Sequence, residues 1–227
     1  MFNIANCSQL VIPPQLRNFS FLVGFSISHS GIAEWNADAA VTQDSHPRIQ
    51  FIAFAYVLLT GVPEGILHDI PHQLRDIEFS HTNLTVIPSD INESWSNVGT
   101  LYIEYSNVQH IPESLMHMAL IDLSLIGNGL VTVPELAQLP SSIGFVALDN
   151  NPLIALPDKF DNSADFEISQ FSLENTEVTT VPAVLLDTTS VHFLYMQGTP
   201  YCASTSRKDE APCLESYELP TGKCLMS

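Results

Sequence analysis

The side chains best suited to chemistry are carboxylates near the middle of the chain, at Asp76, Glu78, Glu104 and Asp122. Carboxylate oxygens are the ligands that Ca²⁺ prefers in proteins. The segments around these residues contain no calcium-loop pattern that would fix a coordination geometry. We therefore predict no calcium site, and binding of a partner becomes the alternative role for these acids.

A second candidate is the histidine pair His68 and His72, whose i,i+4 spacing is that of a helical zinc site. Pro71 lies between them and interrupts a helix, and no catalytic glutamate pattern accompanies the pair. The chain also lacks a GxSxG nucleophile motif and a phosphate-binding loop. The sequence thus predicts no metal site, no cofactor and no enzyme.

A repeated pattern spaces these acids along the chain, and it is clearest in residues 143–157. Apolar residues, an amide and a proline stand there at fixed offsets: Ile143, Val146, Leu148, Asn151, Leu153, Leu156 and Pro157. Two neighbouring copies, which begin at Leu120 and Ile168, keep the same offsets. Further copies begin at Leu22, Ile49, Leu74, Val98 and Val191. The copies therefore start roughly 22 to 27 residues apart.

A pattern of this kind predicts stacked coils. Val146 and Leu148 are separated by one residue, so both point to one face of a short strand. An Asn or Thr after the strand can bond backbone groups in the turn, and a proline can start the return path, where no ladder donor is needed. One copy cannot bury its apolar face alone, so each copy must cover its neighbour.

The pattern LxxLxLxxNxLxxLP resembles the leucine-rich repeat family. The resemblance implies an α/β-type leucine-rich repeat solenoid, a curved right-handed coil with a parallel concave sheet of about eight short strands and an irregular or 3-10 convex side. We expect one domain in three parts. They are an N-terminal cap or truncated repeat in residues 1–21, whose strand is missing, the repeats in 22–200 and a cysteine-containing C-terminal cap in 201–227.

A narrower resemblance concerns residues 6–16, 31–35, 101–106, 123–128 and 198–202, which resemble the ectodomain of oomycete leucine-rich repeat surface proteins. It implies a secreted or membrane-anchored ectodomain and transfers no catalytic residue. No signal-peptide pattern follows Met1, and the apolar run 49–59 is too short to cross a bilayer. We therefore expect an extracellular or cell-surface chain whose signal peptide and transmembrane segment lie outside these residues, with no membrane insertion by the chain itself.

The cysteines, Cys7, Cys202, Cys213 and Cys224, all fall outside the repeats. Disulfide caps that seal the two ends of a solenoid would have this placement. About eight strands at roughly 4.8 Å each separate Cys7 from the others, so we expect no bridge between the two ends. An odd cysteine at each end suggests a fragment that lacks the partner of Cys7. The alternative is a cytosolic protein with reduced cysteines.

Other modification motifs point in two directions. Asn6, Asn18, Asn83 and Asn92 each begin an N-x-S/T sequon and are candidate glycosylation sites, although such sequons also occur by chance. The chain ends in Cys224-Leu225-Met226-Ser227, which fits the form of a prenylation signal and would favour an intracellular membrane face. Only Lys223 precedes it, so we favour a cap cysteine there.

The outward positions of the predicted strands form four columns on the concave face. The repeat aligns Asp76 with Thr100 and Asp122 in the first column, and Glu78 with Tyr102 in the second. The last column is His29, Tyr56, His81, Tyr105, Gly127, Asn150, Asn175 and Gly198. The four columns contain carboxylates and no Lys or Arg. We predict one ligand-binding patch at Phe51, Tyr56, Asp76, Glu78, His81, Tyr102, Glu104 and Tyr105, with a smaller aromatic spot at Phe193 and Tyr195.

Tyrosines beside carboxylates suit a protein or peptide partner, and a basic partner is compatible with them. The alternative is an ordinary solvated sheet face. The formal net charge of −18 argues against nucleic acids and anionic membranes, whose phosphates require Lys and Arg. The sequence therefore predicts an extracellular recognition module, of the kind found in receptor or adhesion ectodomains. The alternative is an intracellular repeat scaffold for another protein, and no oligomeric state is indicated.

Overall fold

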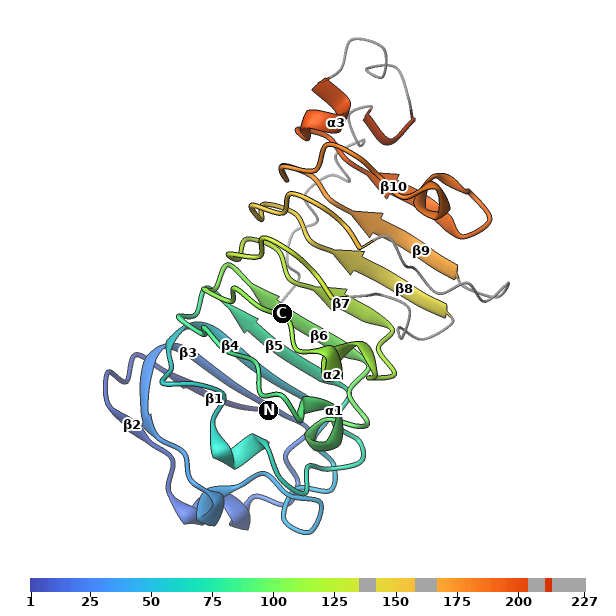
Figure 1. Cartoon of the computed structure of the whole chain (residues 1–227). Helices are drawn as coiled ribbons and strands as arrows, with labels where there is room; N and C mark the ends of the chain where they lie inside the picture. The colour runs from blue at the N-terminus through green and yellow to red at the C-terminus, as the bar shows by residue number, and fades with distance from the viewer. Residues whose placement is uncertain (135–141, 158–166, 204–210, 214–227) are drawn as a thin grey trace.

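Strands of one parallel sheet lie side by side along the molecule, one from each repeat (Figure 1). The computed structural model describes residues 1–134, 142–157, 167–203 and 211–213. In the order of pairing the strands are β1 (Phe2–Ala5), β3 (Gly24–Glu34), β4 (Phe51–Leu58), β5 (Asp76–Ser80), β6 (Thr100–Glu104), β7 (Asp122–Ser124), β8 (Ser142–Ala147), β9 (Glu167–Ser172) and β10 (Val191–Tyr195). A short strand β2 (Leu10–Val11) pairs with β3 beside this series. The predicted solenoid with a parallel sheet is confirmed.

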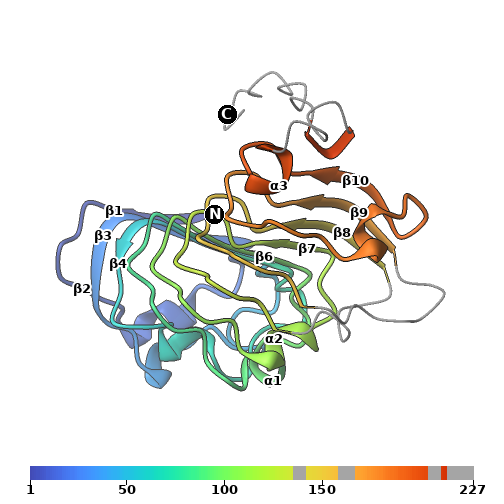
Figure 2. The same ribbon diagram turned by 45° about the horizontal axis from the view of Figure 1, so that its top comes forward.

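Short helices lie on the return paths, on the side of the coil away from the sheet, as α1 and α2 show in Figure 2. They are η1 (Pro14–Asn18), η2 (Ala37–Ala39), η3 (Glu64–Ile66), α1 (Ile91–Ser94), α2 (Glu113–Met116) and η5 (Ala183–Leu186). Pro63, Pro112 and Pro182 come directly before η3, α2 and η5. A proline is suited to that place because it has no backbone N–H to donate and its ring restricts φ. The return paths therefore begin where the repeated proline predicts.

The apolar residues of the repeat make one continuous core. Leu125, Leu148 and Leu173 lie at equivalent positions of three successive copies and are 0%, 2% and 0% exposed. Aromatic residues of adjacent coils also pack on one another, since the rings of Phe54 and Phe79 stack with centroids 4.7 Å apart. Each coil thus covers the apolar face of the next, as a solenoid requires.

Buried amides connect successive coils. The Asn128 side chain donates from Nδ2 to the Ile103 carbonyl at 2.7 Å, and its Oδ1 accepts the Val108 N–H at 3.1 Å. One coil later, Asn151 Oδ1 accepts the Leu130 N–H at the same distance of 3.1 Å. These bonds satisfy backbone groups that would otherwise be buried without partners in the turn after each strand.

The first repeat differs from the sequence prediction, which took its strand to be missing. Residues Phe2–Ala5 form β1, which pairs in parallel with β3 over Phe2 to Ala5. The Phe2 ring stacks on Phe25 at 5.6 Å. The main series therefore contains nine strands within the described residues, one more than the repeat count predicted. The copy was missed because it begins with the strand and retains only part of the apolar pattern upstream of Ile12-Pro13.

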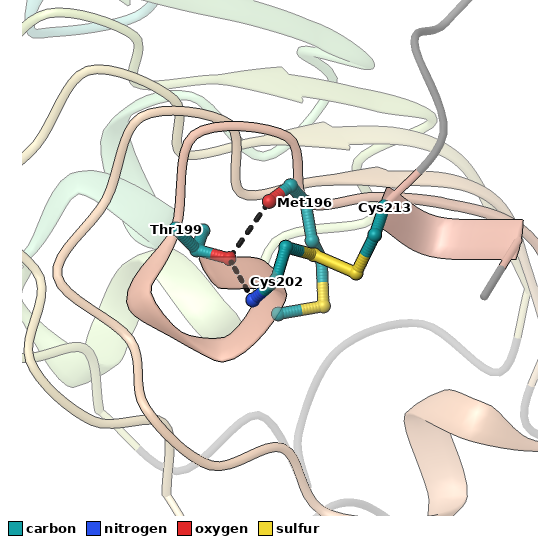
Figure 3. The surroundings of a disulfide bond; sticks show 4 residues. All are labelled: Met196, Thr199, Cys202 and Cys213. Atoms are coloured by element: carbon teal, nitrogen blue, oxygen red, sulfur yellow. Dashed lines mark hydrogen bonds between the residues drawn. A yellow bond between two sulfur atoms is a disulfide. The ribbon is translucent and has the colours of Figure 1, made fainter. Parts of the chain in front are cut away.

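A disulfide closes the C-terminal end of the coil. Cys202, in helix α3 (Pro200–Ala203), is bonded to Cys213, in helix η6 (Ala211–Cys213), with their Cα atoms 5.3 Å apart (Figure 3). The Met196 N–H donates to the Pro212 carbonyl at 2.8 Å, so the bridged segment covers the backbone that follows β10. The sequence analysis predicted a disulfide cap at this end without specifying the pairing, and the Cys202–Cys213 bridge agrees with that prediction.

The other two cysteines have different outcomes. Cys7 is a half-buried free thiol whose Sγ lies 3.6 Å from the Ala5 carbonyl oxygen. Cys224 and the terminal Cys-Leu-Met-Ser lie outside the described residues.

Candidate binding surface on the concave sheet

The predicted columns of the concave face are confirmed by the strand register. Asp76 pairs with Thr100, which pairs with Asp122. In the next column Glu78 pairs with Tyr102. Side chains that are 22 or 24 residues apart in sequence therefore stand on neighbouring strands, about 4.8 Å apart.

Four carboxylates surround Tyr102, and we call this group the acidic patch: Asp76, Glu78, Tyr102, Glu104 and Asp122. Burial raises the pKa of the Tyr102 phenol to about 12, and the negative charges of Asp122, Asp76, Glu104 and Glu78 contribute in that order. These charges disfavour a phenolate because like charges repel. Tyr102 therefore stays a neutral hydrogen-bond donor at any physiological pH.

The carboxylates of the patch also repel one another. Burial raises the pKa of Asp76, and the Asp122 charge raises it further. Burial, Asp76 and Glu104 raise the pKa of Glu78, and burial alone raises that of Asp122. Asp76 Oδ1 is buried and accepts no hydrogen bond within the described part of the chain. A cationic group placed among these oxygens would relieve both the repulsion and the missing bond.

Part of the acidity serves the fold. Glu104 Oε1 accepts a hydrogen bond from Ser124 Oγ of the next coil at 2.5 Å. The same arrangement recurs two coils later, where Asp149 Oδ1 accepts Ser172 Oγ at 2.6 Å. Ser124 and Ser172 are 0% and 7% exposed. Each acid thus satisfies a buried hydroxyl across a strand pair, so only part of Glu104 remains for a ligand.

The four predicted columns omit one further column at the start of the strands. Its backbone pairing runs from Arg75 through Gly99 to Ile121 and Gly144. Ile121 is 62% exposed and has glycines on both sides in this column, so its side chain projects alone beside Asp122. Gly99 and Gly144 stand one repeat before and one repeat after Ile121, and this alignment is the sequence signal that could have revealed Ile121.

Arg75 in this same column is a cation at the edge of the patch. Together with Gln50, Phe51, Gln73 and Asp76 it lines a hollow of about 440 Å³. Its guanidinium donates to the Asn97 carbonyl at 2.8 Å, which directs it toward the start of the strands. The predicted aromatic Phe51 therefore borders the acidic patch, with Arg75 at the rim.

The remaining predicted aromatics form a separate strip. His29, Tyr56, His81 and Tyr105 stack on successive coils with ring centroids 5.0, 4.5 and 4.7 Å apart, and we call them the aromatic stack. Each has positive φ, between 47° and 57°. This conformation, unfavourable for L-residues, turns every one of these side chains onto the same rim of the sheet.

The stack ends at Gly127, which follows Tyr105 in the column. A Cβ on Gly127 would lie 2.5 Å from the Tyr105 ring. Because the rings cover one another, a ligand can reach mainly their edges, which carry the phenol and imidazole polar atoms. The single patch that the sequence predicted is therefore two adjoining strips, the acidic patch with Phe51 and the aromatic stack.

The second predicted spot lies on the last strand of the sheet. Phe193 is 57% exposed, and Tyr195 is half-buried. Both line a hollow of about 410 Å³ with Leu186 and Pro212. Strands β8 and β9 separate it from Asp122 on β7, the nearest strand of the acidic patch, so it is a distinct surface.

The weaker candidates also have positions in the structure. His68 and His72 line a hollow on the return path with Asp90 and Glu93. Within the described residues, no three His, Cys, Asp or Glu side chains are arranged to hold a metal ion. The described helices are all too short or too polar to cross a membrane.

The candidate glycosylation sites differ in exposure. Asn6, Asn18 and Asn83 have exposed side chains, whereas Asn92 is half-buried in α1. Asn6 precedes His29 in the rim column and has a φ of 61°.

Comparison with known proteins supports the repeat architecture. No family model matches the chain. Fibromodulin from Sus scrofa and from Oryctolagus cuniculus is 28% identical to it over 92 residues, which is 40% of this chain and 61% of each relative. The chain therefore spans less than two thirds of the length of these curated relatives.

Two solved structures share the fold. A chain of the Toll–Spatzle complex of Drosophila aligns with a TM-score of 0.57 at 16% identity, over 82% of this chain and 31% of that one. A leucine-rich repeat protein of Leptospira interrogans aligns with a TM-score of 0.58 at 14% identity, over 91% of this chain and 63% of that one. At these identities the likeness establishes the architecture of the coil.

Proposed function

This chain is a leucine-rich repeat protein, and on that premise we propose that it is an extracellular recognition module that binds a protein or peptide on its concave face. The acidic patch around Tyr102 is the observation that carries the proposal. It combines a neutral tyrosine with four carboxylates on adjacent strands, at a place where side chains face away from the core. Tyrosine supplies contact area and a polar group at low entropic cost, as binding surfaces require.

The chemistry of the patch favours a basic partner. Lys and Arg side chains would pair with carboxylates that repel one another in the free protein. Exposed Ile121 and half-buried Phe51 flank the patch and can contact the apolar parts of the same partner. One of the solved structures of this fold is a complex between Toll and Spatzle, which supports a protein as the class of partner.

The Cys202–Cys213 bridge supports an extracellular location, because disulfides persist in oxidising compartments. A module of this kind suits the ectodomain of a receptor or an adhesion protein, and we propose no catalytic role for it. The likeness to oomycete surface proteins stays a prediction. An intracellular scaffold would instead contain Cys202 and Cys213 as thiols. Mass spectrometry of alkylated, unreduced protein from its native source distinguishes the two locations.

The binding proposal is tested with two synthetic peptides of equal length, one of alternating Arg and Gly and one of alternating Glu and Gly. We expect the Arg peptide alone to bind, with an affinity that falls as salt rises. The double variant E78Q/D122N keeps the side-chain shapes and removes two charges of the patch. It should weaken binding by roughly tenfold, equivalent to about 1.4 kcal/mol.

The matched control is E113Q/E177Q, which removes two exposed charges outside the patch. It changes the net charge equally, so it separates a specific site from attraction to an acidic protein as a whole. Equal weakening by both double variants, or equal binding of both peptides, would reject the acidic patch as the binding site.

A further inference from the structure

Asn83 takes over a hydrogen bond that a buried asparagine makes in other coils, at a coil where that asparagine is absent. In the coils of β6 and β7, the N–H of Val108 and that of Leu130 are accepted by an asparagine of the next coil. The equivalent group in the coil of β4 is the Leu59 N–H, and the residue in the asparagine position of the next coil is Thr82, whose side chain is shorter. The Leu59 N–H instead donates to Asn83 Oδ1 at 2.6 Å.

This replacement leaves the two halves of the Asn83 amide in different situations. The buried residues Asn128 and Asn151, which are 9% and 2% exposed, also use Nδ2 to bond carbonyl groups. Asn83 is exposed, and no hydrogen bond among the described residues involves its Nδ2. Its oxygen is therefore held by the neighbouring coil, and its nitrogen has no hydrogen bond to the described residues.

Asn83 is also the first residue of the sequon Asn83-Leu84-Thr85. Leu84 is 1% exposed and belongs to the core, whereas Thr85 is exposed. The sequon thus presents its acceptor and its hydroxyl residue outward while the residue between them points inward. A glycan on Nδ2 would not displace any core side chain.

We propose that Asn83 carries an N-linked glycan, an inference that rests on the proposed extracellular location. The donor is an oligosaccharide attached through its C1 to a lipid pyrophosphate. The C1–Nδ2 bond forms, the bond from C1 to the pyrophosphate oxygen breaks, and Nδ2 loses one proton while the lipid pyrophosphate leaves. The product keeps the amide oxygen, so the Leu59 N–H keeps its acceptor.

The position has a consequence for binding. Asn83 lies two residues after His81 of the aromatic stack, in the segment that leaves the rim of the sheet. A glycan there flanks the aromatic stack and leaves the columns of the acidic patch open. We therefore expect the glycosylated protein to bind the Arg peptide as well as the T85A variant does.

The test is translation of the full chain, fused to a cleavable signal peptide, in the presence of endoplasmic-reticulum microsomes. The variants are T85A, which removes the sequon and keeps Asn83, and T85S, which keeps both. We expect endoglycosidase-sensitive glycan on Asn83 in the parent chain and in T85S, identified by conversion of Asn83 to Asp on enzymatic release. On a denaturing gel, the T85A product should migrate faster than the parent chain by the mass of one glycan.

Protease protection in the same assay reports entry into the microsomes. A protected parent chain with unmodified Asn83 would overturn the inference, and it would leave the binding proposal standing because that rests on the peptide experiment. Because the signal peptide is supplied, the result is independent of where the native protein is directed.

A second measurement tests the structural half of the inference on protein from bacteria, which lacks the glycan. The N83A variant should have a lower unfolding midpoint than T85A, because only N83A removes the acceptor of the Leu59 N–H. Equal midpoints would contradict the role of Asn83 as a replacement for the buried amide.

Discussion

At the scale of single residues, carboxylates have two different roles in this protein. Those around Tyr102 repel one another, whereas the carboxylate of Asp149 accepts hydrogen bonds from the buried hydroxyl of Ser172 and from the N–H of Glu174. The first arrangement leaves charge available to a partner, and the second uses it to join two coils. Hydrogen-bond partners rather than residue type distinguish a binding acid from a structural one.

Asp149 provides a prediction about pH and stability. Burial raises its pKa to about 6, against 3.8 in an unfolded chain, although its bonds to Ser172 and Glu174 act in the opposite direction. The folded state then binds this proton more tightly, so its stabilising effect grows as pH falls from about 7 to about 4. In urea titrations across this range, D149N should lose that gain relative to the parent chain. An identical pH profile in both proteins would contradict the assignment.

His46, near the N-terminal end, predicts the opposite trend, a stability that decreases as pH falls. It is fully buried, its Nε2 lies 3.0 Å from the Leu16 carbonyl oxygen and its Nδ1 lies 2.9 Å from Ser45 Oγ. Burial lowers its pKa, and the nearby Arg17 charge lowers it further, although the bond to the Leu16 carbonyl raises it. The unfolded state therefore takes up the proton first. Stability that is present above about pH 6.5 is lost as pH falls below it.

Hydrogen exchange can measure this local effect. After correction for intrinsic rates, amides of η1 should lose protection between about pH 7 and pH 5, while amides of β6 serve as the internal control. Unchanged protection of η1 would show that protonation of His46 does not weaken the attachment of η1 through the Leu16 carbonyl.

At the scale of elements, the turn after each strand has the same backbone conformation throughout the solenoid. Its rim position has positive φ in every described coil, and the residue is His, Tyr, Asn or Gly: Asn6, His29, Tyr56, His81, Tyr105, Gly127, Asn150, Asn175 and Gly198. Asparagine and glycine accept this conformation readily. Histidine and tyrosine do so at a cost, which the stacking of their rings offsets.

Gly127 offers a direct test of that arrangement. A Cβ there would meet the Tyr105 ring, and φ is +67°. We expect G127A to destabilise the fold by roughly 1 to 3 kcal/mol in urea unfolding. The matched control is G61A, because a Cβ at Gly61 would have no neighbour within 4 Å. Similar losses in the two variants would mean that the contact with Tyr105 does not matter.

At the scale of the whole molecule, each coil contacts mainly its neighbours, so stability passes along the solenoid from one pair to the next. The two ends are then the weakest points, because each has a face without a neighbour. The Cys202–Cys213 bridge and the bond from Met196 to Pro212 cover the end after β10. The bridge should therefore protect the last coils most.

The double variant C202S/C213S tests this expectation. A loop of this length, with a sequence separation of 11, predicts a loss of about 2 to 3 kcal/mol. Hydrogen exchange should increase in β9 and β10 and stay unchanged in β4. Equal increases along the whole sheet would indicate that the coil unfolds as one unit instead of from its end.

Much of the fold could be predicted from the sequence, because a solenoid is built from local periodicity. The apolar residues at fixed offsets determined the parallel strands, their register and the columns of outward side chains, including the alignment of Glu78 with Tyr102. Each repeat interval corresponds to one step of the coil, so sequence spacing translates directly into spatial neighbourhood. The strand β1 was missed where its copy of the pattern is incomplete.

Only the tertiary structure decided how the outward residues divide into surfaces. Positive φ turned Tyr56, His81 and Tyr105 onto the rim, away from the acids with which the sequence had grouped them. Hydrogen bonds between coils likewise revealed that one oxygen of Glu104 accepts the Ser124 hydroxyl, and that Asn83 accepts the Leu59 N–H. The period of a repeat specifies which residues are neighbours. The backbone conformation at each turn, and the bonds between coils, specify which atoms remain free to meet a partner.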